Sequence, residues 1–240
     1  MMIGERDIQD WDRIADLYDL VAGGEADPIY AVLRSSLWEN LGELSGRRLL
    51  DVGCGSGWLS CELHRAGARV TGVDGSSKLL ERARSRGPTI TYLEHDLSTG
   101  LPGGVGVFDL AVAHMVFMDI EPLDPLLRDL RAALPADGRL VFTIPHPCFF
   151  NMKRDRDEHS GQEFRRVTGY LKPETWRIDA FGGHNHYHRS LTDYFSALRS
   201  AGFLVSALVE PPQIAGSSTG PRSDFICNIP VFILIQAMAV

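Results

Sequence analysis

The stretch LLDVGCGSGW, residues Leu49–Trp58, decides how this chain is expected to fold. Its apolar start is typical of a buried strand, and the closely spaced glycines predict a tight turn that leads into a helix. Strand, glycine turn and helix in this order form the layout of a nucleotide-cofactor site. Asp51 places a carboxylate at the mouth of the turn, where the commonest dinucleotides have their phosphates. The sequence therefore raises the question of which cofactor fits a negatively charged turn.

The overall composition is that of an ordinary globular protein. The chain has 240 residues, of which 44% are hydrophobic and 23% charged, which is enough for one sizeable domain. A net charge of −7 disfavours a nucleic-acid partner, because binding to a phosphate backbone favours a basic surface. The four cysteines fit no zinc spacing and indicate a reducing compartment.

No stretch of the sequence predicts export or membrane insertion. The first residues carry charges and lack the apolar core of a signal peptide. The most apolar tract, Ile229–Val240, contains Pro230 and Gln236 and is shorter than the ~20 residues of a membrane helix. We expect a cytoplasmic protein that has no membrane partner.

Outward from the glycine turn, short apolar runs alternate with helical patterns, which predicts βαβ units around a parallel sheet. The expected strands are 48–53, 69–74, 89–95, 108–114 and 139–144. The expected helices are 11–21, 57–66, 76–85, 124–134 and 191–201, with Ser76 and Asp124 as N-caps. Two further strands are expected at 203–210 and 225–236.

The spacing of the glycines separates two kinds of cofactor. Trp58 stands where the dinucleotide fingerprint has its third glycine, and Asp51 would repel a pyrophosphate. Asp74 ends the second expected strand, where an acidic residue accepts hydrogen bonds from a ribose, and Asp96 follows the third strand at a place suited to an adenine amino group. Together these residues predict a phosphate-free nucleoside with a positively charged amino-acid tail. S-adenosylmethionine (SAM) is that molecule.

At this point the chain resembles the class I SAM-dependent methyltransferases. LLDVGCGSG, VTGVDGSS, YLEHDL and FDLAVAHMVFMDI are similar to the first four motifs of that family, and LRAALPADGRLVFTIPHP is similar to the segment through its fifth strand. The resemblance covers roughly Trp11 to Gln236. It implies an α/β Rossmann-like fold whose seven-stranded sheet has the order 3-2-1-4-5-7-6, with strand 7 antiparallel and helices on both faces.

The resemblance also implies the organisation of the chain and its cofactor site. We expect one methyltransferase domain over 1–240, made of an N-terminal helical cap (1–45), a core (46–145 and 191–240) and a substrate lid inserted after strand 5 (146–190). Gly53 and Gly55 are expected near the methionine part and Asp74 at the ribose. The full set of expected cofactor-binding residues is Tyr18, Asp51, Gly53, Gly55, Asp74, Gly75, Leu79, Asp96, Leu97 and His114.

The acceptor is expected to be a small organic molecule, and the aromatic segments around the site favour a specialised metabolite. Ligands in such folds bind beyond the carboxyl ends of the strands, where an aromatic lid excludes water and favours a sulfonium. The motif of nucleic-acid amine methyltransferases is missing after strand four. We expect methylation of oxygen or nitrogen by in-line displacement, with acceptor contacts from Trp11, Phe117, Phe149, His186 and Tyr187.

Histidines supply the candidates for acid–base chemistry. His146, beside the end of the fifth strand, is the candidate general base, because histidine titrates in the useful range. His184, His186 and His188 alternate and share one side of an extended segment, but we expect no metal there, since the carboxylate clusters of magnesium-dependent methyltransferases are not evident. Three alternatives are considered: a SAM-fold protein with a non-methylating reaction such as cyclisation, an NAD(P) oxidoreductase, which Asp51 and Trp58 disfavour, and a regulatory or partner-binding subunit with a vestigial cofactor site, which the intact motifs disfavour.

Overall fold

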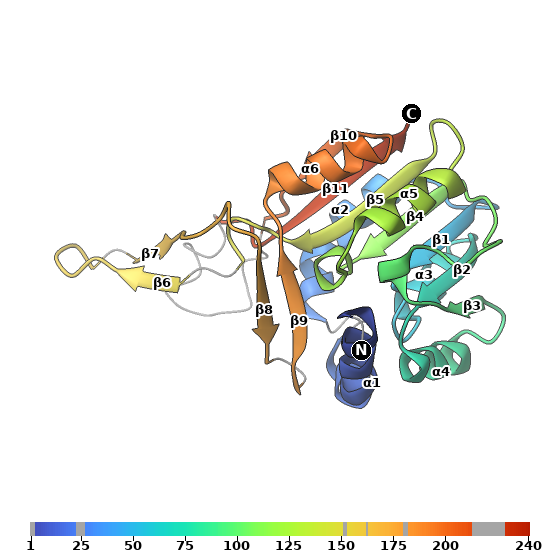
Figure 1. The fold of residues 1–240 in the computed structure, drawn as a ribbon, viewed down its shortest axis with the longest axis horizontal. Coiled ribbons are helices and arrows are strands. Elements are labelled where there is room, and N and C mark those ends of the chain that lie inside the picture. Colours follow the sequence, from blue (N-terminus) through green and yellow to red (C-terminus); the bar gives the residue numbers. More distant parts are fainter. Residues whose placement is uncertain (1–2, 23–26, 151–152, 162, 180–181, 213–228) are drawn as a thin grey trace.

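A seven-stranded sheet forms the centre of the molecule (Figure 1). The computed structural model describes residues 3–22, 27–150, 153–161, 163–179, 182–212 and 229–240. The strands stand in the order β3-β2-β1-β4-β5-β11-β10, and β11 is antiparallel to both of its neighbours. This confirms the predicted order, with β10 and β11 as the sixth and seventh strands of the sheet. The strands are β1 (Arg48–Val52), β2 (Arg69–Asp74), β3 (Thr91–Glu94), β4 (Leu110–His114), β5 (Arg139–Pro145), β10 (Phe203–Val209) and β11 (Phe232–Ala239).

Both faces of the sheet are covered by helices, because the side chains of its central strands alternate between two cores. Leu50 and Phe142 lie in the core on one face, and their neighbours Leu49 and Val141 lie in the core on the other. The first core includes residues of α5 (Asp124–Ala133) and α6 (Leu191–Ser200). The second includes residues of α2 (Pro28–Leu41), α3 (Trp58–Arg65) and α4 (Ser77–Arg86).

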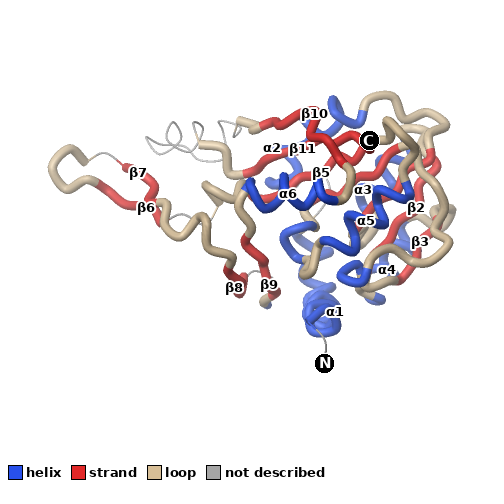
Figure 2. Tube along the Cα trace, turned by 45° about the horizontal axis from the view of Figure 1, so that its top comes forward, coloured by secondary structure: helices blue, strands red, loops and turns tan. Residues whose placement is uncertain are grey.

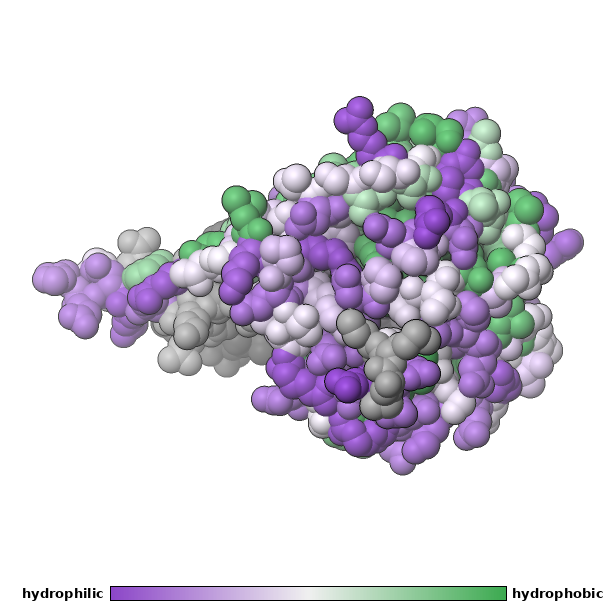
Figure 3. Space-filling view, in the orientation of Figure 1, coloured by the Kyte–Doolittle hydropathy of each residue, from purple (hydrophilic) through white to green (hydrophobic). Residues whose placement is uncertain are grey.

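Helix α1 (Ile3–Val21) stands apart from these layers, beside α4 and below the carboxyl ends of the strands in Figure 1. It begins eight residues before the start predicted from the Trp11 stripe. Asp12 of α1 accepts a hydrogen bond from Ser76 Oγ (2.6 Å), and Arg82 and Arg86 of α4 pair with Asp19 of α1. The face seen in Figure 3 is mainly hydrophilic where α1 and α4 lie. These contacts fix α1 across the edge of the sheet at which ligands of this fold bind.

The insertion after β5 is more regular than its sequence indicates, because it forms two antiparallel hairpins. The first hairpin projects away from the body as an arm, and the second lies between this arm and α1 (Figures 1 and 2). The alternation of HNHYH did predict an extended segment at 184–188. The strands are β6 (Lys153–Arg156), β7 (Glu163–Arg166), β8 (Glu174–Ile178) and β9 (His184–His188).

Among the other predicted boundaries that differ from the structure, two differ for an identifiable local reason. Leu123 rather than Asp124 is the N-cap of α5, and Asp124 lies in the first turn, where its charge still favours the helix dipole. The last strand begins at Phe232 rather than 225, after Pro230, which has no N–H for a ladder hydrogen bond; residues 225–228 lie outside the described residues. Within the described ranges, no helix has the length and apolar character needed to cross a membrane.

Candidate active site

One carboxylate joins the glycine turn to the end of the neighbouring strand. Asp74, the last residue of β2, accepts hydrogen bonds from Gly55 N at Oδ2 and from Ser76 N at Oδ1, both 2.8 Å long. Gly53 and Gly55 have φ of 66° and 52°, a region that favours glycine, and a Cβ at Gly53 would lie 2.6 Å from Val116. The turn is therefore closely packed on the side of Val116, and a ligand can approach its backbone only from the opposite side.

Asp51 lies beneath this turn and is 2% exposed. Its Oδ2 accepts a hydrogen bond of 2.5 Å from Ser60 Oγ. Burial raises the pKa of Asp51 to about 7, because desolvation disfavours the charged carboxylate, and the nearby Asp74 raises this pKa further. Burial also raises the pKa of Asp74. A positively charged ligand beside these carboxyl groups would favour their ionised forms.

Two cavities open around the turn, with volumes of about 100 and 510 Å³. The smaller cavity reaches over the ends of β2 and β3, and the larger one reaches toward α2 and β9. They are joined by residues that line both: Trp11, Tyr18, Gly53, Gly55, His114, Met115 and Asp119. Met115 has a positive φ of 57°, a strained conformation of the kind that gathers at functional sites.

Acidic side chains line these cavities, and neither lysine nor arginine does so among the described residues. The acidic residues are Asp7, Asp27, Asp51, Asp74, Asp96, Asp119 and Glu121. A pyrophosphate would meet carboxyl groups and no basic side chain of this lining, whereas a sulfonium and an ammonium group would be attracted and would favour the ionised carboxylates. The acidic lining thus fits a cationic, phosphate-free nucleoside. This is the kind of cofactor that fits a glycine turn with a carboxylate, Asp51, at its mouth.

Helix α1 forms one wall of the smaller cavity. A Cβ at Gly4 would lie 2.5 Å from Asp96 Oδ2, which shows how closely the helix approaches the end of β3. Small-molecule sites typically have volumes of ~300 Å³ or more, and the smaller cavity falls below that range. We therefore expect α1 to shift when a nucleoside enters.

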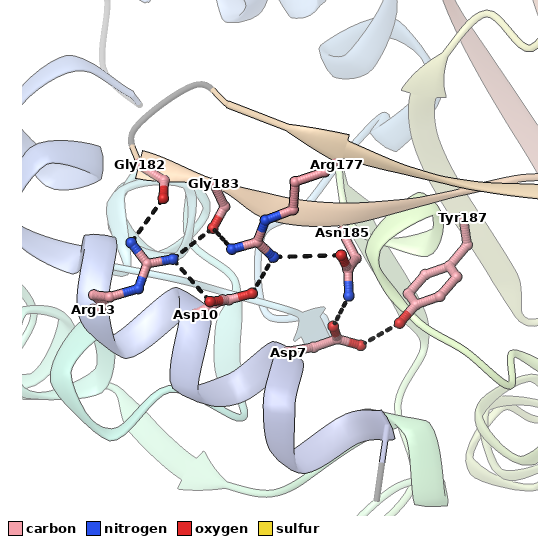
Figure 4. A network of polar contacts seen from close by, with 8 residues as sticks. All are labelled: Asp7, Asp10, Arg13, Arg177, Gly182, Gly183, Asn185 and Tyr187. Atoms are coloured by element: carbon pink, nitrogen blue, oxygen red, sulfur yellow. Dashed lines mark hydrogen bonds and ion pairs between the residues drawn. The ribbon is translucent and has the colours of Figure 1, made fainter.

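A polar network ties α1 to the β8–β9 hairpin (Figure 4). Asp7 accepts hydrogen bonds from Asn185 Nδ2 (2.8 Å) and Tyr187 Oη (2.6 Å). Asp10 pairs with both Arg13 and Arg177, and both arginines donate to Gly183 O at 2.9 Å. The helix and the hairpin therefore cover the site as one connected lid.

Replacing Arg177 with Ala is expected to loosen this lid. The loss of its bonds to Asp10 and Gly183 removes roughly 1–2 kcal/mol of partly exposed interactions, so SAM should dissociate several-fold faster. Stopped-flow fluorescence of Trp11 would measure the rate. The matched control is Arg166→Ala, because Arg166 pairs with Asp155 within the projecting arm; an equal change in both variants would contradict the connection.

Comparisons with known proteins agree with this geometry. Residues 50–142 match a family model described as a methyltransferase domain. The crystal structure of an S-adenosylmethionine dependent methyltransferase from Mesorhizobium loti is 30% identical, with a TM-score of 0.75 over 86% of this chain and 97% of that one. A ubiquinone biosynthesis O-methyltransferase of Bordetella parapertussis is 48% identical over 128 residues, which are 49% of this chain and 52% of the relative. A demethylmenaquinone methyltransferase of Tropheryma whipplei is 29% identical over 147 residues, 58% and 59% of the two chains.

The fold and the acidic cavities define an enzyme that binds a cationic nucleoside. The chain belongs to the class I SAM-dependent methyltransferases, and its cofactor is SAM. All ten residues expected to bind this cofactor line one of the two cavities or both. Their motifs follow strand ends directly, which is why the sequence placed them together. Their individual contacts with SAM stay predictions.

Of the five residues expected to contact the acceptor, two line the cavities and three do not. Trp11 lines both cavities and His186 lines the larger one. Phe117 is fully buried in the core against Phe142, with ring centroids 4.8 Å apart, and lines neither cavity. Tyr187 and Phe149 line neither cavity as well, since one binds Asp7 and the other packs on His146. The acceptor contact predicted for Phe117, Phe149 and Tyr187 is not supported by their positions.

The lining of the larger cavity includes Asp119 and Ile178, which sequence reasoning did not assign to the site. It also includes Met118 and Phe150, which belong to the aromatic and sulfur-rich segments expected around the site, and His184 of the alternating histidines. The rings of Trp11 and His184 are 4.7 Å apart, and His186 stacks between Phe150 and Trp176. Burial lowers the pKa of His184 and of His186 to about 4, so both rings are neutral at pH 7. Within the described residues no cluster of three or more His, Cys, Asp and Glu side chains is arranged to hold a metal.

His146 does not occupy the position of a general base. It is 2% exposed and lines neither cavity. Its Nδ1 accepts a hydrogen bond from Cys148 N (3.1 Å), so its Nε2 carries the proton and donates to Glu210 (3.0 Å). Both ring nitrogens are therefore engaged in holding the chain after β5, and burial lowers the pKa of the ring.

Replacing His146 with Ala is expected to affect stability and leave SAM affinity unchanged within about twofold. Loss of the two hydrogen bonds should lower the free energy of unfolding by roughly 1–3 kcal/mol. A depressed pKa contributes stability that is present above about pH 6.5 and lost as the pH falls through the folded-state pKa, so the difference should shrink in acid. Denaturant unfolding and SAM calorimetry would test this, and a large loss of SAM affinity would contradict the structural role.

Proposed function

We propose that this protein transfers the methyl group of SAM to an oxygen or nitrogen atom of a small organic acceptor held in the larger cavity. The observation that carries this proposal is the larger cavity, which is partly open, has a volume of about 510 Å³ and shares residues with the cofactor site. This volume lies within the range of ~300–1,000 Å³ that small-molecule sites occupy. A folded protein or a nucleic acid would need an open groove instead.

The lining of the larger cavity supports an acceptor with aromatic or apolar character. Aromatic and sulfur-containing side chains dominate its outer part, and its two histidines are neutral at pH 7. Trp11 and Tyr18, whose rings meet edge to face at 5.2 Å, stand at the junction of the two cavities. Their faces would attract a sulfonium and exclude water from it.

Within this proposal each cofactor-binding residue has a task. Gly53 and Gly55 allow the backbone to approach the methionine part, Asp51 attracts its ammonium group, and Asp74 binds the ribose hydroxyls. Asp96 caps the short helix Leu97–Thr99 through Oδ1 and is suited to bind the adenine amino group. Leu79, 2% exposed, packs on the adenine ring.

SAM supplies a methyl group bonded to a positively charged sulfur, which is reactive without further activation. The chain orients the acceptor in line with this bond, and such orientation is worth several kcal/mol. Strands β8 and β9 of the insertion act as a lid in this scheme, because they supply Ile178, His184 and His186 to the wall of the larger cavity. The names of the relatives support acceptors of this class: one acts in ubiquinone biosynthesis as an O-methyltransferase.

Transfer of label from methyl-labelled SAM in a bacterial lysate would test the acceptor class before the acceptor itself is identified. The purified protein is incubated with lysate, and the products are separated by ultrafiltration into small molecules and macromolecules. Label in the small-molecule fraction supports the proposal. Label found only in macromolecules, or a small-molecule fraction no different from that of the Asp74→Asn variant, contradicts it.

A further inference from the structure

Asp119 is an ionisable group at the junction of the two cavities, and it is not among the residues expected to bind the cofactor. It ends the short helix Phe117–Asp119, directly after β4, and it lines both the smaller and the larger cavity. Its Oδ1 is buried and accepts no hydrogen bond among the described residues. A buried polar atom without a partner costs roughly 1–3 kcal/mol, so this oxygen is suited to a ligand that brings a donor.

The other side chains at the junction are less suited to take a proton. His114 Nδ1 lies 2.7 Å from Thr143 Oγ1, and burial lowers the pKa of this histidine to about 4. Burial raises the pKa of the Tyr18 hydroxyl, which keeps it protonated. Asp119 is therefore the junction residue whose carboxyl group lines both cavities and has one oxygen without a hydrogen-bond partner among the described residues.

We propose that Asp119 accepts the proton that the acceptor loses during methyl transfer. This inference rests on the proposed function, since it requires a small acceptor with an O–H or N–H group in the larger cavity. The acceptor atom forms its bond to the methyl carbon, the sulfur keeps the electron pair of the broken carbon–sulfur bond, and the proton moves to Asp119 Oδ1. The step starts with a sulfonium and a carboxylate and ends with two neutral groups, so charge balances without another reactant.

Asp119 has to be ionised for this role, and the structure indicates how SAM ionises it. Burial raises the pKa of Asp119 well above its ordinary value, and the neighbouring Asp7 of α1 raises it further. SAM brings a positive sulfur to the junction, which favours the carboxylate. The titratable and charged groups around Asp119 come from α1, β4, the loop after the short helix Phe117–Asp119, β9 with the residue that follows it, and α6. They are Asp7, Tyr18, His114, Glu121, His184, Arg189 and Tyr194.

Calorimetry with SAM alone tests this inference and needs no acceptor. SAM is titrated into the wild-type protein and into Asp119→Asn in buffers of different ionisation enthalpy, which gives the number of protons released on binding. Above the ordinary pKa of 3.8, where burial keeps Asp119 protonated in the empty protein, the wild type should release up to one proton more than Asp119→Asn. S-adenosylhomocysteine, whose sulfur is neutral, should abolish this difference.

Asp137→Asn is the matched control, because Asp137 lies in an exposed turn with φ of 64°, which asparagine also adopts. It should release as many protons as the wild type. Equal release from wild type and Asp119→Asn overturns the inference, whatever the lysate experiment shows about the acceptor. Asp119→Ser serves as a second variant if Asp119→Asn unfolds, and the same proton deficit is expected of it.

Discussion

Replacing Asp74 with Asn is expected to weaken SAM binding by about 100-fold or more. The carboxylate of Asp74 accepts hydrogen bonds from the N–H groups of Gly55 and Ser76, and in our proposal it also binds the ribose. An amide presents an NH₂ group toward one of these N–H donors, so the turn shifts and the ribose contact is lost. Charge-assisted hydrogen bonds contribute about 1.5–3 kcal/mol each, and 100-fold corresponds to ~2.7 kcal/mol. Isothermal calorimetry of the apo protein with SAM would measure the change.

Asp109→Asn is the control for this experiment. Asp109 also accepts a hydrogen bond from a backbone N–H, that of Arg48 (2.8 Å), but it lies at the opposite end of the sheet, before β4, and lines neither cavity. It should leave SAM affinity unchanged. Similar losses of SAM affinity in the two variants would show that Asp74 acts through the stability of the sheet rather than through the cofactor.

The cofactor half of the site could be predicted from the sequence because its determinants are local. Asp51, Gly53 and Gly55 lie within five residues, and Asp74 and Asp96 follow the ends of strands β2 and β3, which parallel pairing brings to one edge. Parallel strands, each followed by a turn, leave little freedom in where these residues go. The order of the seven strands was implied by the resemblance to the family, and the structure confirms it.

The acceptor half was predicted less well, because side-chain direction in short irregular segments depends on tertiary packing. Phe117 and Asp119 lie two residues apart in one turn of 3₁₀ helix, yet the first enters the core and the second enters the junction of the cavities. No periodicity distinguishes these directions over three residues. His146 was misjudged for a related reason: its partner Glu210 is 64 residues distant in sequence.

Asp51→Asn is expected to stabilise the apo protein at neutral and alkaline pH while it weakens SAM binding by roughly tenfold. The pKa of Asp51 is raised to about 7 in the folded protein from an ordinary value of 3.8. The folded state therefore retains a proton that the unfolded state loses. The stability linked to this group is fully present below about pH 4 and is lost as the pH rises to about 7, by roughly 1.4 kcal/mol per pH unit and roughly 4 kcal/mol in all. Asparagine has no such loss and still accepts the Ser60 hydrogen bond through its amide oxygen.

Urea unfolding of both proteins between about pH 4 and pH 8 would show the effect, with curves that coincide in acid and separate as the pH rises. Asp109→Asn should give a nearly constant difference over this interval, because the hydrogen bond from Arg48 N lowers the pKa of Asp109, and the stability linked to this group is complete above about pH 4 and is lost only in stronger acid. SAM affinity of the wild type should rise over the same interval in which its stability falls, since the charge that destabilises the empty pocket attracts the ammonium group. If the free energies of unfolding of Asp51→Asn and wild type differed by the same amount at every pH, Asp51 would be ionised in the empty protein. The preference of the pocket for a cation would then come from the other acidic residues.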